Sequence, residues 1–239
     1  YSISTIGPGP RATRHWGYAQ ERGMKTLAKI QANNTWELSA VPYIPAVANV
    51  AQHGANLRET GVDGLMLGWT LGGCPSPNLE VMAEMGANKD LTVDGALLKV
   101  AQNRVGETLA PDLVEAWQRF SAAFSEYPYH GGLLYKAPVQ MGPANVLFPE
   151  DTGYAATMVG IPYDDLQGWR AVFPPDVFAG QYEKMAKGFE QAIDKVRATL
   201  QSTELSLVQQ SAVDEEMRVA EVCAIHFQSV ANQARFVMH

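Results

Sequence analysis

The segment formed by residues 26–77 constrains the fold of this chain most strongly. It contains two short apolar runs, residues 27–31 and residues 63–71, and each run is bounded by glycine or asparagine. Between them, over residues 45–60, apolar side chains recur every three or four positions, as on one face of a helix. Two buried strands joined by an amphipathic crossover helix form a β-α-β unit, so the sequence predicts a parallel sheet here.

The residues before this unit predict an α/β fold. Residues 1–6 alternate like a strand, and residues 11–22 have the spacing of a helix that ends at Gly23. The N-terminal part therefore predicts the order strand, helix, strand, helix, strand. This order matches the last three strands of a (β/α)8 barrel, and we expect residues 1–95 to be the C-terminal part of such a barrel.

From residue 96 onward the pattern becomes helical, and we expect residues 96–239 to form a mainly α-helical domain. One helix is predicted to begin at Pro111, since proline is favoured in the first turn. Two long helices, residues 175–200 and residues 203–237, carry apolar side chains at three- and four-residue spacing and should pack as an antiparallel hairpin. The Pro- and Gly-rich region before them contains many aromatic residues, which predicts an ordered, irregular loop region.

Composition excludes several partners and sites. The formal net charge of the 239 residues is −7 and the basic residues are scattered, so we expect no nucleic acid partner. No apolar run approaches the roughly 20 residues of a membrane span, which predicts a soluble protein. Cys74 and Cys223 lie far apart, so we expect no disulfide, no metal site and no cofactor. The chain opens without a signal-peptide pattern or an initiator methionine, which leaves cytoplasmic and periplasmic locations and the natural N-terminus open.

The predicted chemistry lies at the ends of the two strands in the β-α-β unit. Parallel α/β barrels present functional side chains at the carboxyl ends of their strands, where Glu37 and Trp69 fall on consecutive strands. A carboxylate beside an aromatic ring suits glycoside hydrolysis, because the carboxylate attacks or stabilises an oxocarbenium-like centre while the ring stacks on a sugar. The structural alternative is that Glu37 pairs with an arginine and that Trp69 fills the barrel.

Two sequence motifs resemble bacterial glycoside-hydrolase-like TIM-barrel proteins. The motifs are Asn-Asn-Thr-Trp-Glu-Leu-Ser at residues 33–39 and Gly-Leu-Met-Leu-Gly-Trp-Thr-Leu-Gly-Gly-Cys-Pro-Ser-Pro-Asn at residues 64–78. Residues 116–121, 142–145 and 227–233 look similar to later segments of the same proteins. The resemblance would therefore cover nearly the whole chain.

The resemblance implies specific roles at the strand ends. In the large retaining clan of such barrels, a nucleophilic glutamate follows the seventh strand and a sugar-stacking aromatic residue follows the eighth. Glu37 matches the nucleophile and Trp69 matches the aromatic residue. Trp36, Asn34 and Asn78 lie in the same motifs, and we expect them to contact an oligosaccharide or glycoside substrate. The acid/base glutamate of the clan follows the fourth strand, and no position in this sequence corresponds to it.

Other polar residues are weaker candidates for a functional site. Asp164 and Asp165 are adjacent in a Pro-Tyr loop, where turn and cap roles are more common than ligand binding. His53 lies in the predicted crossover helix and is expected to be a surface or packing residue, and His226, between two apolar residues, is expected to be a satisfied core histidine and not a base. His130, beside two glycines, could reach a ligand.

Three functional classes stay open. The leading one is a glycoside hydrolase, or its C-terminal portion, which cleaves with retention through Glu37. The second is a non-catalytic carbohydrate-binding protein, and the third is a structural or assembly subunit. Because three parallel strands leave open edges, we expect the missing N-terminal barrel half or a second chain to supply strands and the acid/base carboxylate. If the chain is active alone, that carboxylate is expected to be one of Glu80, Glu84, Asp164 and Asp165.

Overall fold

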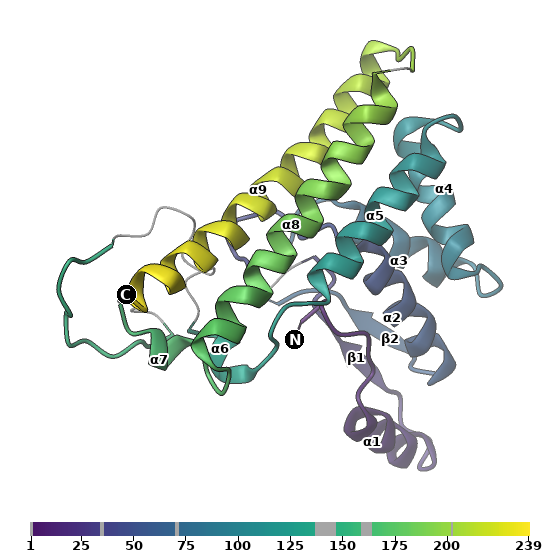
Figure 1. Cartoon of the computed structure of the whole chain (residues 1–239). Helices are drawn as coiled ribbons and strands as arrows, with labels where there is room; N and C mark the ends of the chain where they lie inside the picture. The colour runs from purple at the N-terminus through teal and green to yellow at the C-terminus, as the bar shows by residue number, and fades with distance from the viewer. Residues whose placement is uncertain (1, 34–35, 70–71, 137–146, 159–163, 202) are drawn as a thin grey trace.

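The computed structural model describes residues 2–33, 36–69, 72–136, 147–158, 164–201 and 203–239. This part of the chain is mainly helical, with one small parallel sheet (Figure 1). Within these ranges, no helix combines the length and the apolar character that crossing a membrane requires.

A strand-helix-strand unit forms in the N-terminal part, as the sequence predicts. Strands β1 (Leu27–Lys29) and β2 (Gly64–Met66) pair in parallel, with Ala28 opposite Leu65. Helix α2 (Val47–Glu59) connects the strands and buries its apolar face. The β-α-β prediction is therefore confirmed, although both strands are shorter than the apolar runs suggested.

The barrel fragment predicted for residues 1–95 is wrong, because the sheet of the described residues contains β1 and β2 alone. Residues 3–5 form a turn and not a third strand. The hydroxyls of Ser2 and Ser4 lie 2.7 Å apart, and Ser4 N–H donates to Ser2 Oγ at 3.1 Å. Short polar side chains of this kind give the backbone a local alternative to a strand ladder, which the alternating pattern does not reveal.

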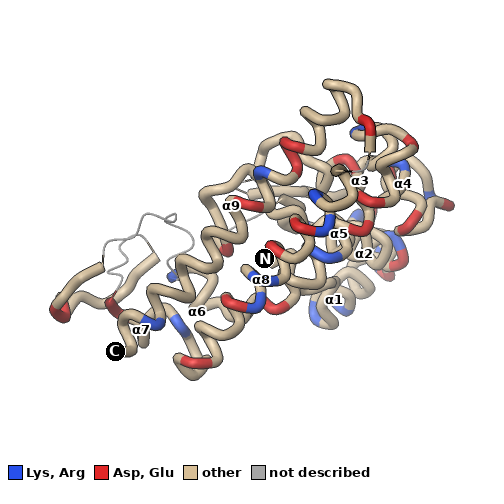
Figure 2. Tube along the Cα trace, turned by 45° about the horizontal axis from the view of Figure 1, so that its top comes forward, with Lys and Arg blue, Asp and Glu red and all other residues tan. Residues whose placement is uncertain are grey.

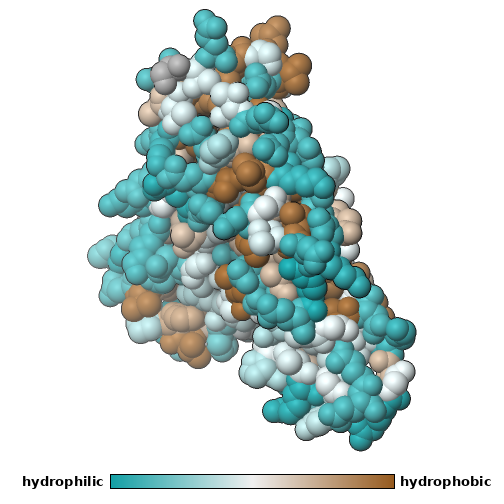
Figure 3. Space-filling model, turned by 90° about the vertical axis from the view of Figure 1, so that its right-hand side faces the viewer, coloured by the Kyte–Doolittle hydropathy of each residue, from teal (hydrophilic) through white to brown (hydrophobic). Residues whose placement is uncertain are grey.

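Helix α1 (Pro10–Gln20) precedes β1 and contains no buried residue. Gln20 Nε2 ties its end to the sheet, because it donates to Thr26 Oγ1 and to Thr60 O at 3.1 Å each. Gly23 follows with a φ of 69°, as expected for a glycine that terminates a helix. Figure 3 shows the end of the molecule that contains α1 as a lobe that projects from the main body.

Three helices pack around α2 and lead away from the sheet: α3 (Pro77–Ala87), α4 (Val93–Val105) and α5 (Ala110–Phe124). Ser76 and Thr92 cap α3 and α4, since each hydroxyl accepts a backbone N–H bond of 3.1 Å from three residues further on. The helix predicted at Pro111 is confirmed, and α5 begins one residue earlier.

The two longest helices, α8 (Pro175–Leu200) and α9 (Leu207–Val237), form the predicted antiparallel hairpin and lie side by side in Figure 1. The bounds of α8 agree with the prediction. Helix α9 begins later than predicted, because Ser206 and Gln209 form a capping box that fixes its start.

The loop region between α5 and α8 contains two one-turn helices among its described residues, α6 (Gly131–Leu134) and α7 (Leu166–Trp169). Residues 137–146 and 159–163 of this region lie outside the described residues. The side chain of Trp169 is fully buried, and its ring centroid lies 5.5 Å from that of Phe178 in α8. This part of the loop region therefore packs on the hairpin.

An aromatic cluster joins the hairpin to α5. The ring centroid of Phe227 lies 5.4 Å from that of Phe189 and 5.9 Å from that of Phe124. Phe189 also lies 5.0 Å from Phe120, and all four rings are buried. Buried residues before and after residue 95 belong to one hydrophobic core, and the division into two domains at that residue stays a prediction.

A buried ion pair connects α9 to α4. Arg104 Nε donates to Glu216 Oε1 at 2.7 Å, and Arg104 Nη1 donates to Glu80 Oε1 at 2.6 Å. Trp117 Nε1 donates to the other oxygen of Glu216 at 3.2 Å. Burial raises the pKa of the Glu216 carboxyl, and the charge of Arg104 opposes that shift. Glu216 is only 2% exposed, so its charge depends on these partners.

Candidate functional site

The segments that carry the predicted site residues leave the sheet at the same edge. Backbone pairing continues past both strands, since the N–H groups of Ile30 and Ala32 donate to the carbonyls of Met66 and Leu67 at 2.9 Å each. The carboxyl ends of parallel strands meet at one edge of a sheet, which brings the chain after β1 next to the chain after β2.

Trp69 has a fixed backbone and an exposed ring. Gln31 Oε1 accepts from Trp69 N–H at 2.9 Å, and Gln31 Nε2 donates to Trp69 O at 3.3 Å. The Gln31 side chain is buried, whereas Trp69 is 59% exposed. The ring is therefore not core packing, and its position is set by a buried amide on the neighbouring strand. Sequence reasoning did not single out Gln31.

Asn33 holds the loop after β2 in place through its side-chain amide. Asn33 Nδ2 donates to Gly72 O and to Cys74 O at 2.7 Å each, and its Oδ1 accepts from the Ser76 hydroxyl. Asn33 thereby fixes the chain after β2, although the sequence pointed to its neighbour Asn34. Asn34 lies outside the described residues.

Asn78, predicted to contact substrate, is fully buried. Its Nδ2 donates to Ala32 O and to Ile44 O at 2.8 Å each. These bonds hold the start of α3 against the chain after β1. The structure thus places the Asn78 amide on main-chain carbonyls, where it supports the loops of the site.

Glu37, the predicted nucleophile, is fully buried. Its Oε1 accepts a hydrogen bond of 3.2 Å from Ile3 N–H. The turn that contains Ile3 is held by Asn49 of α2, whose Nδ2 donates to Ile3 O at 3.0 Å and to Ser121 O at 3.3 Å. The turn at Ile3 therefore covers the carboxylate and is fixed to α2 and α5.

Two tyrosines lie close enough to Glu37 to sense its charge. Burial raises the pKa of Tyr182, and the negative charge of Glu37 raises it further. Burial also raises the pKa of Tyr127, with smaller contributions from Tyr182 and Glu37. The two rings meet edge to face with centroids 6.1 Å apart. Both hydroxyls are buried, and they interact with each other as well as with the charge of Glu37.

Trp36, which directly precedes Glu37 in the loop after β1, is half-buried. Its ring centroid lies 6.1 Å from that of Tyr135, with an angle of 55° between the planes. Tyr135 follows α6, so the loop region brings an aromatic ring to the loop after β1. This contact could not be read from the sequence, because the two residues are far apart in the chain.

The other carboxylates that the sequence suggested already have partners. Glu80 bonds to Arg104, and Glu84 pairs with Lys99 at 2.6 Å. Asp164 accepts bonds from the N–H and hydroxyl of Thr152 at 2.6 and 3.0 Å. Asp165 caps α7 and also accepts from Ala156 N–H. The prediction that these two aspartates have turn and cap roles is confirmed.

The histidines have local roles in the structure. His130 caps α6, since its Nδ1 accepts from Gly132 N–H at 3.1 Å. His226 is buried in α9, and this burial lowers its pKa to about 4. Burial lowers the pKa of His53 as well, and its ring lies against Gly7. The core position predicted for His226 is confirmed, but its Nδ1 has no hydrogen-bond partner among the described residues, so the ring is not satisfied as predicted.

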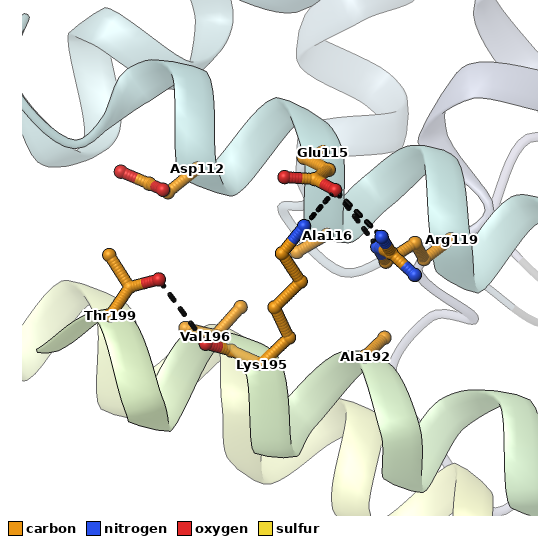
Figure 4. Close-up of a pocket in the computed structure, with 8 residues that line it drawn as sticks. All are labelled: Asp112, Glu115, Ala116, Arg119, Ala192, Lys195, Val196 and Thr199. Carbon is orange, nitrogen blue, oxygen red and sulfur yellow. Dashed lines mark hydrogen bonds and ion pairs between the residues drawn. The ribbon is translucent and has the colours of Figure 1, made fainter.

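A pocket between α5 and α8 is lined by charged residues (Figure 4). Lys195 reaches from α8 to Glu115 on α5, and Arg119 donates to the same carboxylate at 2.8 Å. Lys195 and Arg119 are thus both paired with Glu115, and none of the predicted site residues lines this pocket. In the described ranges, no group of three or more His, Cys, Asp or Glu residues could hold a metal ion.

Comparison of the chain with protein-family models, with curated proteins and with solved structures yields no match. The resemblance to glycoside-hydrolase-like TIM-barrel proteins is therefore wrong as an identification, since neither a matching family nor a barrel sheet supports it.

Proposed function

We propose that the chain acts on a glycoside at the carboxyl ends of β1 and β2, with Trp69 as the stacking surface and Glu37 as the nucleophile. The observation that carries the proposal is the exposed ring of Trp69 on a backbone that Gln31 fixes at two points. An exposed aromatic ring that is held in place can cover one apolar face of a sugar with little loss of conformational entropy.

Glu37 would supply the carboxylate for such a site. In retaining hydrolysis the carboxylate attacks the anomeric carbon and forms a glycosyl ester, while the leaving oxygen takes a proton from a second carboxylic acid. Water then hydrolyses the ester, and the second group takes up the proton of the water. That second acid stands about 5–5.5 Å from the nucleophile. Glu80 and Glu84 are held in ion pairs, and no described residue is assigned to this role.

The test measures turnover and binding with 4-nitrophenyl glycosides and with cello-, xylo- and chito-oligosaccharides. Glu37→Gln should abolish turnover and keep affinity, because it removes charge and almost no volume. Trp69→Ala should weaken binding by about 1–3 kcal/mol through lost stacking and burial. Glu115→Gln and Tyr18→Ala serve as matched controls, since they change a paired surface carboxylate and an exposed ring on α1.

Each outcome separates the candidate functions. Unchanged turnover in Glu37→Gln excludes the nucleophile, and equal affinity in Trp69→Ala excludes the stacking surface. The absence of any saturable sugar binding would contradict both roles and leave the third candidate, an assembly subunit.

The complete burial of Glu37 favours a second candidate, carbohydrate binding without turnover. A nucleophile must reach the anomeric carbon, and the turn at Ile3 covers its Oε1 in this structure. In a binding protein, Glu37 would instead anchor that turn through its bond to Ile3. Saturable sugar binding with no turnover, together with loss of stability in Glu37→Gln, identifies this second function.

A further inference from the structure

We propose that residues 2–9 form a lid over the Glu37 carboxylate, closed in this structure, which opens to give a ligand access to that carboxylate. The lid covers Glu37 directly, because Ile3 N–H donates to Glu37 Oε1 at 3.2 Å, and Ser2, Ile3 and Ser4 are all buried. The role of the lid rests on the function proposed for Glu37, since a fully buried carboxylate cannot meet a sugar while the lid is closed.

The lid is attached through side chains and not through a backbone ladder. In the part of the chain that the structure describes, residues 2–8 form no backbone–backbone hydrogen bond. Apart from the bond to Glu37, Asn49 Nδ2 donates to Ile3 O at 3.0 Å and Asn56 Nδ2 donates to Gly7 O at 2.8 Å. No side chain of residues 2–9 is charged, and in Figure 2 the first coloured residues of the chain lie on α1. A segment with so few backbone bonds opens at a lower free energy than the rest of a fold.

Opening of the lid leaves the buried amide of Asn49 with partners. Its two N–H groups lie within hydrogen-bond distance of three acceptors, which are Ile3 O, Ser121 O at 3.3 Å and Ser125 Oγ at 3.2 Å. When Ile3 leaves, the two acceptors from α5 remain. The freed N–H and C=O groups of Ile3 reach water. Because an unpaired buried donor is far more costly than an exchange of partners, this arrangement favours a reversible opening.

Gly7 and Gly9 provide a hinge next to α1. A Cβ atom on Gly9 would meet no atom within 4 Å, so this part of the backbone has space to rotate. A Cβ atom on Gly7 would lie 2.8 Å from His53 Nε2, so the closed lid fits against His53 only with glycine at this position. Small residues at a hinge absorb large changes of φ and ψ. Burial of the Ile3 side chain keeps the lid closed in the free chain.

The test measures how fast the Glu37 carboxyl couples to glycine ethyl ester in the presence of a carbodiimide. Trypsin cleavage at lysine and arginine yields the peptide of residues 30–58, in which Glu37 is the only acidic residue, so mass spectrometry reports its coupling directly. In the free chain, Glu37 should couple at least about tenfold more slowly than the exposed Glu107. Equal rates at these two residues overturn the proposal.

A matched pair of glycine variants tests the contact with His53. Gly7→Ala should accelerate coupling at Glu37 about fivefold or more, because the added methyl group displaces the closed lid from the His53 ring. Gly9→Ala adds the same methyl group where there is space for it, and coupling should stay within about twofold of the unchanged chain.

A matched pair of asparagine variants tests the bond to the lid. Asn56→Ala should accelerate coupling at Glu37 about fivefold, because the closed lid loses the bond to Gly7 O. Asn232→Ala, which removes an asparagine from α9, should leave the rate unchanged. Unchanged coupling at Glu37 in both Gly7→Ala and Asn56→Ala overturns the proposal.

Coupling at Glu216 distinguishes the lid from unfolding of the whole chain. This carboxylate is 2% exposed and lies on α9, so opening of the lid should leave it protected in every variant. If Gly7→Ala accelerates coupling at Glu37 and at Glu216 by the same factor, global unfolding is the route to both residues, and the proposal is overturned.

An arm with sugar separates the lid from the glycoside function. The coupling rates of the free chain test the lid alone, and the absence of saturable sugar binding contradicts the glycoside function alone. With a bound cello-, xylo- or chito-oligosaccharide, coupling at Glu37 should stop while amide hydrogen exchange at Ile3 accelerates, because the sugar takes the place of Ile3 at the carboxylate. Exchange at Ile3 that stays the same or slows in the complex overturns the lid.

Discussion

The β1–β2 sheet and the α8–α9 hairpin differ in how they bury their apolar residues. In the hairpin, Phe178, Tyr182, Phe189 and Phe227 are fully buried against one another and against α5. In the sheet, Leu27 is mostly exposed although it lies within a strand. Both regions have sequences that predict burial, but within the described residues the sheet buries Ala28 and leaves Leu27 exposed.

The difference follows from backbone hydrogen bonding. A helix satisfies its interior N–H and C=O groups by itself, so two helices need only cover one apolar face each. A strand depends on neighbours at both edges, and a parallel sheet also depends on cover for both faces. The hairpin should therefore supply most of the stability, and the exposed positions of the sheet should tolerate substitution.

The largest expected effect is in the hairpin. Phe227→Ala should lower the free energy of unfolding by about 3–5 kcal/mol, because it empties a site that contacts Phe124, Tyr182 and Phe189. Ile225→Ala, an exposed position on the same helix, is the control and should change stability by less than about 0.5 kcal/mol. Urea unfolding checks both values. A loss below about 1 kcal/mol for Phe227→Ala would contradict a close-packed hairpin core.

The next effect concerns the ion pair that connects α9 to α4. Arg104→Met should lower the free energy of unfolding by about 3 kcal/mol, because the buried carboxylate of Glu216 loses its partner. Adding Glu216→Gln should recover much of the loss. Arg119→Met removes an exposed pair with Glu115 and should cost less than about 1 kcal/mol. Equal losses in Arg104→Met and Arg119→Met would show that burial does not strengthen the first pair.

A third effect is a pH dependence from His226. Burial lowers its pKa from 6.5 to about 4, so the unfolded chain binds a proton at this residue between these pH values while the folded chain does not. Stability should therefore be full above pH 6.5 and fall with decreasing pH, by about 2 kcal/mol at pH 5. His226→Leu should remove this part of the slope. Identical pH profiles of the two proteins in urea unfolding would contradict the buried neutral histidine.

The helical part of the fold could be predicted from the sequence because its signals are local. Pro175 and the three- and four-residue spacing fixed the bounds of α8, and Pro111 located α5. The β-α-β unit was also predicted from apolar runs around a helical pattern. The strand predicted for residues 1–6 is wrong, because residues 3–5 form a turn in which Ser4 N–H donates to Ser2 Oγ, and the alternation of apolar residues does not reveal such a bond.

The candidate site could be predicted only in outline. Glu37 and Trp69 were located through their positions after the two strands. Tyr127 and Tyr182 could not be assigned to Glu37, because helices α5 and α8 bring them there from distant parts of the sequence. The role of Gln31 was missed as well, since a glutamine after a strand carries no signal that its amide will fix the backbone of Trp69.

The smallest expected effect contrasts the two faces of β1. Leu27→Thr should change the free energy of unfolding by less than about 0.5 kcal/mol, because the side chain is mostly exposed and threonine suits a strand. Ala28→Leu, one residue further and on the buried face, should cost about 1–3 kcal/mol, because the added methylene groups have no space against the core. Chemical denaturation of both variants measures the difference.

The losses in unfolding free energy for Leu27→Thr and Ala28→Leu also test whether the face that carries Leu27 and Met66 is exposed in solution. If Leu27→Thr costs as much as Ala28→Leu, the face that carries Leu27 and Met66 is already covered in solution. The sheet then buries its apolar residues as fully as the hairpin does. If Leu27→Thr is neutral while Ala28→Leu is costly, the face that carries Leu27 and Met66 is exposed in the free chain, as it is in the structure. The contrast between sheet and hairpin then reflects a missing neighbour, and not a weaker sequence.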